Sequence, residues 1–103
     1  MAIAFMFEAA SMAQSDYDRA MDAMGLGATD GPYPDGLLAH LAGAADGGRW
    51  RVIDVWETEE HADEFYGSAQ FAPVREGGAE FGITSTPWPL HRADMYAQFH
   101  QLV

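Results

Sequence analysis

Residues 36–60 constrain the fold of this chain more than any other segment. Their sequence, GLLAHLAGAADGGRWRVIDVWETEE, contains two apolar runs separated by the turn formers DGG at residues 46–48. Apolar runs on both sides of a short glycine-containing turn indicate a β-hairpin, with arms at residues 37–42 and 50–56. Thr58 then supplies a typical helix N-cap. The segment therefore predicts strand, turn, strand and helix in direct succession.

Two helices are predicted from the spacing of apolar side chains. Positions i, i+3, i+4 and i+7 are apolar over residues 16–24, and Ser15 with Asp18 resembles a capping box in front of them. The same spacing follows Thr58 and includes Phe65, so a second helix is expected there. Both helices would present one apolar side to the rest of the molecule.

The two ends of the chain complete the predicted sheet. Residues 3–7 are apolar on both faces, as in a strand that is covered on both sides. Residues 80–89 are interpreted as irregular. Residues 90–103 alternate in hydrophobicity, which predicts a long terminal strand.

In chain order these elements are β-α-β-β-α-β, the ferredoxin-like pattern of the α+β class. We expect a single domain over residues 1–103, with a four-stranded antiparallel sheet and two helices on one face. The helices can cover only that face, while the strands carry large apolar residues on both. The second face is therefore expected to meet a second copy of the chain, which would give a homodimer with the form of an α+β barrel.

Composition excludes several classes of partner and chemistry. Sixteen carboxylates against five arginines and no lysine give a formal charge of −11, so neither nucleic acid nor an anionic membrane is an expected partner. The absence of cysteine excludes disulfides, thiolate metal sites and a cysteine nucleophile. The apolar N-terminus lacks a basic flank and meets Glu8 early, which favours a strand over a signal peptide, so we expect a cytoplasmic protein.

His40 and Asp54 are the candidate catalytic residues, because each is the lone ionisable residue in one arm of the hairpin. With a three-residue turn Ala45 faces Arg49, and His40 then lies opposite Asp54 on one face of the sheet. A carboxylate beside an imidazole can orient it as a general base. With a two-residue turn the register shifts by one and the two side chains point to opposite faces. The pair can also be structural, each residue satisfying the other inside the barrel.

Aromatic residues near this pair are the candidate substrate-binding residues. By alternation Trp50 and Trp56 share the face of Asp54, so a pocket there would have indole walls suited to a flat aromatic ligand. Tyr66 on the second helix could form its roof, and His91 is included as a polar contact from the last predicted strand. Ordinary core packing is the alternative explanation for these aromatic residues.

The segments GLLAHLAG, DGGRW and VIDVWETEE, with the second helix and the following Pro73, resemble the dimeric α+β barrel proteins related to the antibiotic biosynthesis monooxygenases. Proteins of this architecture include cofactor-independent oxygenases, haem-degrading enzymes, dehalogenating and cyclising enzymes, and small proteins without an assigned role. The resemblance leaves the oxygenase branch open, in which a tryptophan and polar groups hold an electron-rich phenol that reacts with dioxygen. Trp56 carries over by position. The haem-degrading branch relies on an Asn, a Trp and a His, and this chain has no asparagine, so that triad does not transfer.

The leading hypothesis is a small cofactor-independent enzyme, of monooxygenase or cyclase type. It would act on an aromatic or polyketide-like small molecule in a pocket between sheet and helices. The alternative is a non-catalytic dimeric module that binds a ligand or serves an accessory role, and haem binding through a histidine is a third option. No HxH, HxxxH or HExxH spacing is present, so neither a metal nor another cofactor is expected.

Overall fold

The computed structural model describes residues 1–27 and 32–96 of the chain. Four strands form one antiparallel sheet: β1 (Ile3–Ala9), β2 (Leu37–Ala45), β3 (Arg49–Trp56) and β4 (Ile83–Pro89). Their order across the sheet is β2-β3-β1-β4, so β1 and β3 are central. This is the predicted ferredoxin-like α+β arrangement.

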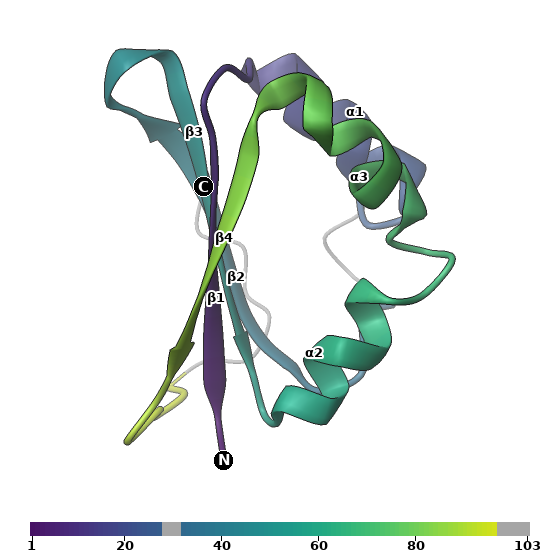
Figure 1. Cartoon of the computed structure of the whole chain (residues 1–103). Helices are drawn as coiled ribbons and strands as arrows, with labels where there is room; N and C mark the ends of the chain where they lie inside the picture. The colour runs from purple at the N-terminus through teal and green to yellow at the C-terminus, as the bar shows by residue number, and fades with distance from the viewer. Residues whose placement is uncertain (28–31, 97–103) are drawn as a thin grey trace.

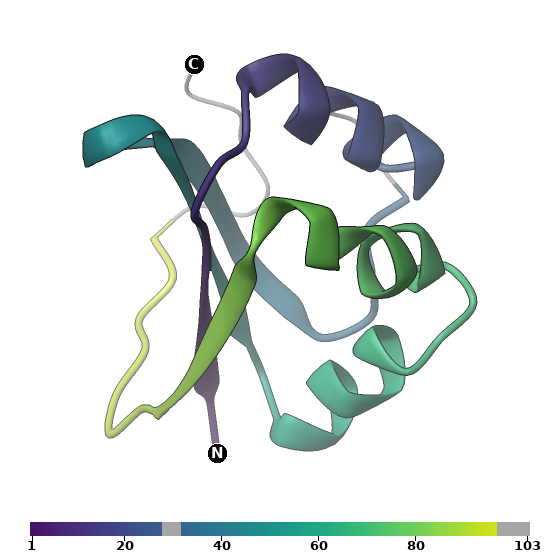
Figure 2. The same ribbon diagram turned by 45° about the horizontal axis from the view of Figure 1, so that its top comes forward.

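Three α-helices lie over one face of the sheet, as Figures 1 and 2 both show. They are α1 (Gln14–Ala23), α2 (Glu59–Tyr66) and α3 (Ala72–Gly77). Short 3-10 helices form the hairpin turn at Asp46–Gly48 and the segment Gly78–Phe81 before β4. None of the helices described is long and apolar enough to span a membrane.

The hairpin has the three-residue turn that brings its two polar residues together. Ala45 pairs with Arg49, and the register then pairs His40 with Asp54. Gly47 and Gly48 both have positive φ, a backbone conformation that glycine adopts without a steric cost. The first of the two predicted registers is therefore confirmed.

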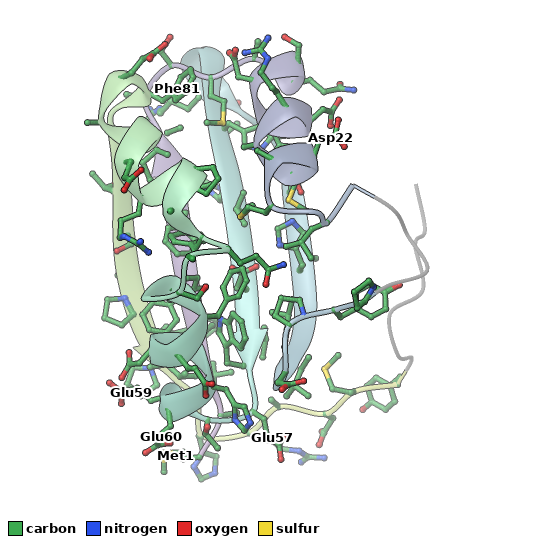
Figure 3. All side chains as sticks on the ribbon, turned by 90° about the vertical axis from the view of Figure 1, so that its right-hand side faces the viewer. Met1, Asp22, Glu57, Glu59, Glu60 and Phe81 are labelled. Atoms are coloured by element: carbon green, nitrogen blue, oxygen red, sulfur yellow. The ribbon has the colours of Figure 1, made fainter. Side chains whose placement is uncertain are left out.

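The two main helices begin differently from one another. Thr58 caps α2 as predicted, because its Oγ1 accepts the backbone N–H of His61. Helix α1 begins before Ser15, and its first turn is closed by Asp16, whose Oδ2 accepts the backbone N–H of Ala13 at 3.0 Å. The predicted Ser15 cap is therefore wrong by two residues. Glu59 and Glu60 in the first turn of α2 complement the positive end of its dipole (Figure 3).

The prediction of the last strand is wrong. The fourth strand is Ile83–Pro89, in the segment interpreted as irregular, while residues 90–96 form no strand and residues 97–103 lie outside the described residues. Pro87 and Pro89 are tolerated because β4 is an edge strand, where a missing N–H costs no ladder bond on the open side. His91 consequently follows the sheet instead of belonging to it.

The helix-covered face of the sheet carries the core. Phe5 and Asp54 pair across β1 and β3, and the alternation of side chains places Trp56 on the same face. Trp56 is completely buried. The buried cluster consists of Ile3, Leu37, Trp56 and Ala62, with Phe5, Phe65 and Tyr66 packed against it.

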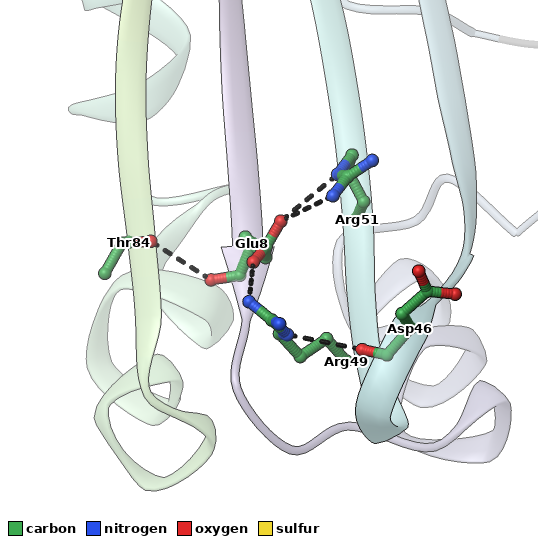
Figure 4. Close-up of polar contacts among 5 residues, drawn as sticks. All are labelled: Glu8, Asp46, Arg49, Arg51 and Thr84. Atoms are coloured by element: carbon green, nitrogen blue, oxygen red, sulfur yellow. Dashed lines mark hydrogen bonds and ion pairs between the residues drawn. The ribbon is translucent and has the colours of Figure 1, made fainter.

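The opposite face of the sheet is open and partly apolar. Leu41 and Trp88, on the two edge strands, are 56% and 55% exposed. At one end of this face Glu8 binds two arginines, Arg49 at 3.0 Å and Arg51 at 2.9 Å (Figure 4). Hydrogen bonds from Arg51 and then from Arg49 hold the pKa of Glu8 below its ordinary value. Because they are exposed to solvent, these two ion pairs contribute little to stability.

Gly36 lets the start of the hairpin pack closely against His61 of α2, and we expect its replacement to lower the stability of the fold. Its φ is +81°, its carbonyl accepts the N–H of Glu57 at 2.8 Å, and an added Cβ would lie 2.3 Å from Cγ of His61. We expect Gly36→Ala to lower the free energy of unfolding by about 1–3 kcal/mol, measured by urea denaturation. Gly43→Ala is the matched control, because a Cβ there meets nothing within 4 Å. Equal losses in the two variants would contradict this account.

Candidate functional site

A continuous chain of hydrogen bonds crosses the space between sheet and helices. It runs from Tyr17 on α1 through His40 on β2 and Asp54 on β3 to Tyr66 on α2, and ends at Trp56 on β3. We call these five residues the polar relay. Each of the two main helices contributes one phenol to it, and the hairpin contributes the other three side chains. The relay therefore ties the helices to the sheet through polar groups.

The centre of the relay is the predicted His40–Asp54 pair. His40 Nδ1 lies 2.6 Å from Asp54 Oδ1, and the Tyr66 hydroxyl donates to Asp54 Oδ2 at 2.8 Å. Both carboxylate oxygens are thus engaged, which offsets the cost of burying Asp54 in an apolar strand. The carboxylate requires Nδ1 of the imidazole to carry a hydrogen. In the neutral imidazole Nε2 is then the basic nitrogen.

Nε2 of His40 is met by the hydroxyl of Tyr17, at 2.5 Å. The two rings are stacked with their centroids 6.0 Å apart. The His40 side chain is 27% exposed, and it belongs to β2, an edge strand of the sheet. A neutral imidazole accepts a hydrogen bond from the Tyr17 hydroxyl in this contact, which makes Tyr17, His40 and Asp54 a phenol–imidazole–carboxylate series.

The two tyrosines of the relay are held in the neutral form. Burial first, and then the charges of Asp54 and Asp18, raise the pKa of Tyr17 to about 12. Burial and the Asp54 charge also raise the pKa of Tyr66 well above its ordinary value. Both hydroxyls therefore act as hydrogen-bond donors at neutral pH.

An alkaline titration tests this description of Tyr17. Between pH about 10 and about 12 the unfolded chain has lost the Tyr17 proton and the folded chain keeps it, so stability falls as the pH rises through this window. We expect the phenolate absorption of Tyr17, isolated as the difference between the protein and its Tyr17→Phe variant, to appear near pH 12. Appearance near pH 10, the ordinary range of a solvent-exposed phenol, would contradict the burial of this hydroxyl.

Trp56 lies where no substrate can touch it without rearrangement of the core. Its side chain is completely buried, and its Nε1 donates to the Tyr66 hydroxyl at 2.8 Å. The ring packs against Phe65 and Tyr66 at centroid distances of 5.6 and 5.5 Å. Trp56 is therefore a core residue at the end of the relay, and its N–H holds the Tyr66 hydroxyl in place.

The other predicted substrate-binding residues lie in different surroundings. Trp50 packs against the Tyr17 ring at 5.2 Å, and its buried Nε1 has no hydrogen-bond partner among the described residues. Tyr66 belongs to the relay and contacts Phe7 and Phe71 at 5.4 and 5.0 Å. His91 is exposed on the segment after β4, and the relay does not include it.

Neither of two hollows in the described part of the chain is lined by His40 or Asp54. One, of about 170 Å³, lies between the sheet and α3, and the other, of about 300 Å³, lies at the hairpin end. The smaller one is close to the size of a cavity that holds a single aromatic ring, and it touches the relay indirectly, through the contacts of Phe7 and Phe71 with Tyr66. Its lining is Phe7, Phe71, Val74, Arg75, Gly78, Ile83 and Ser85.

Sequence reasoning missed Tyr17 as a functional candidate. The helical pattern of the sequence marks this residue only as the first apolar position of α1. A phenol on the buried stripe of a helix needs a hydrogen-bond partner, and this requirement is the signal that could have pointed to the hairpin. Within the described residues no three His, Asp or Glu side chains gather as a metal site requires.

Comparisons with known proteins identify the fold. No family model matches the sequence, and no curated protein does. Among solved structures, the protein Rv0793 of Mycobacterium tuberculosis superposes with a TM-score of 0.71 at 23% identity, over 91% of this chain and 100% of its own. A variant of SnoaB, a cofactor-independent oxygenase of Streptomyces nogalater, superposes with a TM-score of 0.66 at 11% identity, over 89% of this chain and 95% of its own.

A third similar structure carries the family name. A Deinococcus radiodurans protein described as a candidate antibiotic biosynthesis monooxygenase superposes with a TM-score of 0.61 at 13% identity, over 94% of this chain and 99% of its own. At these identities the likeness concerns the fold, and activity has to be argued from the site itself. The chain thus has the fold shared by proteins of the antibiotic biosynthesis monooxygenase type, in keeping with the resemblance of its sequence.

Proposed function

We propose that this protein is a cofactor-independent enzyme, of monooxygenase or cyclase type, that acts on an electron-rich aromatic small molecule. The observation that carries the proposal is the Tyr17–His40–Asp54 series, which places a base on an edge strand of the sheet. A phenolic or enolic substrate must lose a proton before it can donate electrons to dioxygen or close a ring. The series provides a route for that proton.

The proton route follows from the hydrogen bonds. The Tyr17 oxygen takes the substrate proton while its own proton passes to Nε2 of His40, so Tyr17 never has to exist as a phenolate. The imidazolium formed is stabilised by the Asp54 carboxylate on Nδ1. Asp54 is then a positioning residue, and His40 with Tyr17 performs the proton transfer. The Tyr66 hydroxyl, which accepts the Trp56 Nε1–H, donates to the second carboxylate oxygen and holds it in place.

Two further observations support an oxygenase. The protein shares its fold with SnoaB, which is a cofactor-independent oxygenase. The relay is also surrounded by rings that suit a flat aromatic ligand, with Trp50 beside Tyr17 and Phe7 and Phe71 beside Tyr66. Substrate identity is proposed only as a class, an aromatic or polyketide-like phenol.

A binding module without catalysis is the second candidate. It is favoured by the location of the 170 Å³ hollow, whose lining includes Phe7, Phe71 and Ile83 together with the polar Arg75 and Ser85, and which does not reach His40 or Asp54. In that case the relay would be a structural tie between helices and sheet, and the hollow would capture a small apolar ligand.

Dioxygen consumption separates the two candidates. The protein is incubated with a panel of polycyclic phenols and enols, without added metal or flavin, while dioxygen uptake, product formation and quenching of tryptophan fluorescence are recorded. The enzyme proposal expects oxygenated or cyclised product for at least one compound at a rate above that of heat-denatured protein. Fluorescence quenching by several compounds with no product from any of them would overturn it in favour of the binding module.

The proposal includes a homodimer that uses the open face of the sheet. Leu41 on β2 and Trp88 on β4 each expose more than half of their surface on this face. Apolar surface of this kind on an open sheet face is typical of an interface. Light scattering should give twice the mass of the 103-residue chain, and Trp88→Glu should shift it to the monomer. A monomeric wild-type protein at micromolar concentration would contradict the dimer.

A further inference from the structure

The geometry points to Tyr17 as a redox-active residue. We propose that one-electron oxidation of the Tyr17 phenol is coupled to transfer of its proton to Nε2 of His40, which gives a neutral tyrosyl radical. The phenolic oxygen lies 2.5 Å from Nε2, and Nδ1 of the same ring lies 2.6 Å from the Asp54 carboxylate. This reaction requires no substrate in the site, so it stands independently of the proposed oxygenase or cyclase activity.

The electrons and protons of this step balance within the relay. An outer-sphere one-electron oxidant, of which an aryloxyl radical is one chemical class, takes an electron from Tyr17 and becomes an aryloxide. The phenolic O–H bond breaks, and its proton forms a bond to Nε2 of His40. The imidazolium keeps its Nδ1–H on the Asp54 carboxylate, which stabilises the charge. When an electron returns to Tyr17, the proton returns from Nε2 to the phenolic oxygen.

The base is needed because of the surroundings of Tyr17. An oxidised phenol is a far stronger acid than a phenol and has to release its proton at once. Burial raises the pKa of the resting Tyr17 to about 12, so at neutral pH oxidation cannot start from a phenolate. The half-buried hydroxyl points to the imidazole, which is therefore the acceptor within reach.

The neighbouring aromatic residues are less suited to hold the radical. Trp50 packs against Tyr17 at 5.2 Å, but its buried Nε1 has no partner among the described residues that could take a proton. Tyr66 donates to Asp54 Oδ2, and the proton acceptor there is a carboxylate, a weaker base than imidazole. If Trp50 were oxidised first, an electron would therefore transfer from Tyr17 to Trp50 and leave the radical on Tyr17.

Flash photolysis tests the proposal on the whole protein. Photogenerated tris(bipyridine)ruthenium(III) serves as the oxidant, and the tyrosyl radical is followed by its near-ultraviolet absorption and by electron paramagnetic resonance. We expect Tyr17→Phe to lower the yield of the long-lived radical about tenfold. We expect Tyr96→Phe, which removes an exposed phenol, to leave that yield unchanged.

The role of the base is tested by His40→Asn and by solvent deuterium. The amide introduced by His40→Asn would keep a donor for Asp54 but offer no basic nitrogen, so we expect the rate of Tyr17 oxidation to fall about tenfold. In the wild-type protein the same rate should fall in deuterium oxide, a measurement that does not depend on any variant folding. Two results would overturn the proposal. One is a long-lived radical that still forms in Tyr17→Phe, and the other is a rate of Tyr17 oxidation that is unchanged both in His40→Asn and in deuterium oxide.

Discussion

Replacing His40 with alanine should reduce turnover of an aromatic substrate by about 10²–10⁴-fold, the usual contribution of a general base. The reason is the direction of the hydrogen bonds, since Nε2 is the one basic nitrogen that the Tyr17 hydroxyl contacts among the described residues. The measurement is kcat from initial rates of dioxygen uptake or product formation, made well below the melting temperature of the variant. The loss should fall on kcat more than on KM, because His40 does not supply the apolar walls.

A second substitution separates catalysis from folding. His40→Ala also leaves Asp54 Oδ1 without its donor, which costs about 1–3 kcal/mol of stability. His40→Asn places an amide N–H where Nδ1 lies, so it should recover most of that stability and none of the turnover. His61→Gln serves as a control for the loss of a histidine outside the relay. Recovery of turnover in His40→Asn would show that the residue is structural.

Replacing Trp56 with alanine should lower the free energy of unfolding by about 3–5 kcal/mol, the range for a large aromatic residue removed from a core. Trp56 is completely buried, packs against Phe65 and Tyr66, and lies in the central cluster with Ile3 and Leu37. A loss of this size is a large fraction of the stability of a domain this small. Urea denaturation followed by circular dichroism measures it.

Trp56→Phe isolates the polar contribution of the indole. The variant retains most of the ring surface and loses the N–H that donates to the Tyr66 hydroxyl at 2.8 Å. Its expected cost is about 1–2 kcal/mol, since one buried hydrogen bond and some packing are removed. If Trp56→Ala cost no more than Trp56→Phe, the tryptophan could not be the central core residue described here.

The hairpin was the most predictable part of the molecule. The turn formers at residues 46–48 and the alternation of the flanking strands were sufficient to bring His40 opposite Asp54 once the turn length was known. Sequence could not choose between the two registers, because a turn of two or three residues depends on the backbone conformation of Gly47 and Gly48. Local pattern therefore predicted the pair as one of two alternatives.

The errors and the alternatives that the sequence left open concern residues whose environment is set by tertiary structure. Pro87 and Pro89 lie in the segment that was interpreted as irregular, yet an edge strand accepts them. The sequence allows Trp56 to line a pocket or to fill a core, and its complete burial depends on the packing of α2 over β3, which no local pattern reports. Tyr17 lies 23 positions before His40, and no short-range pattern reports a contact at that separation.

The hydrogen placement on His40 is the most direct test of the polar relay. Nitrogen-15 NMR of the His40 imidazole distinguishes the nitrogen that carries a hydrogen from the one that accepts a hydrogen bond. The relay predicts that the hydrogen resides on Nδ1, bonded to Asp54, and that Nε2 has the chemical shift of an acceptor. A hydrogen on Nε2, or shifts that average the two tautomers as for a free imidazole, would contradict the relay.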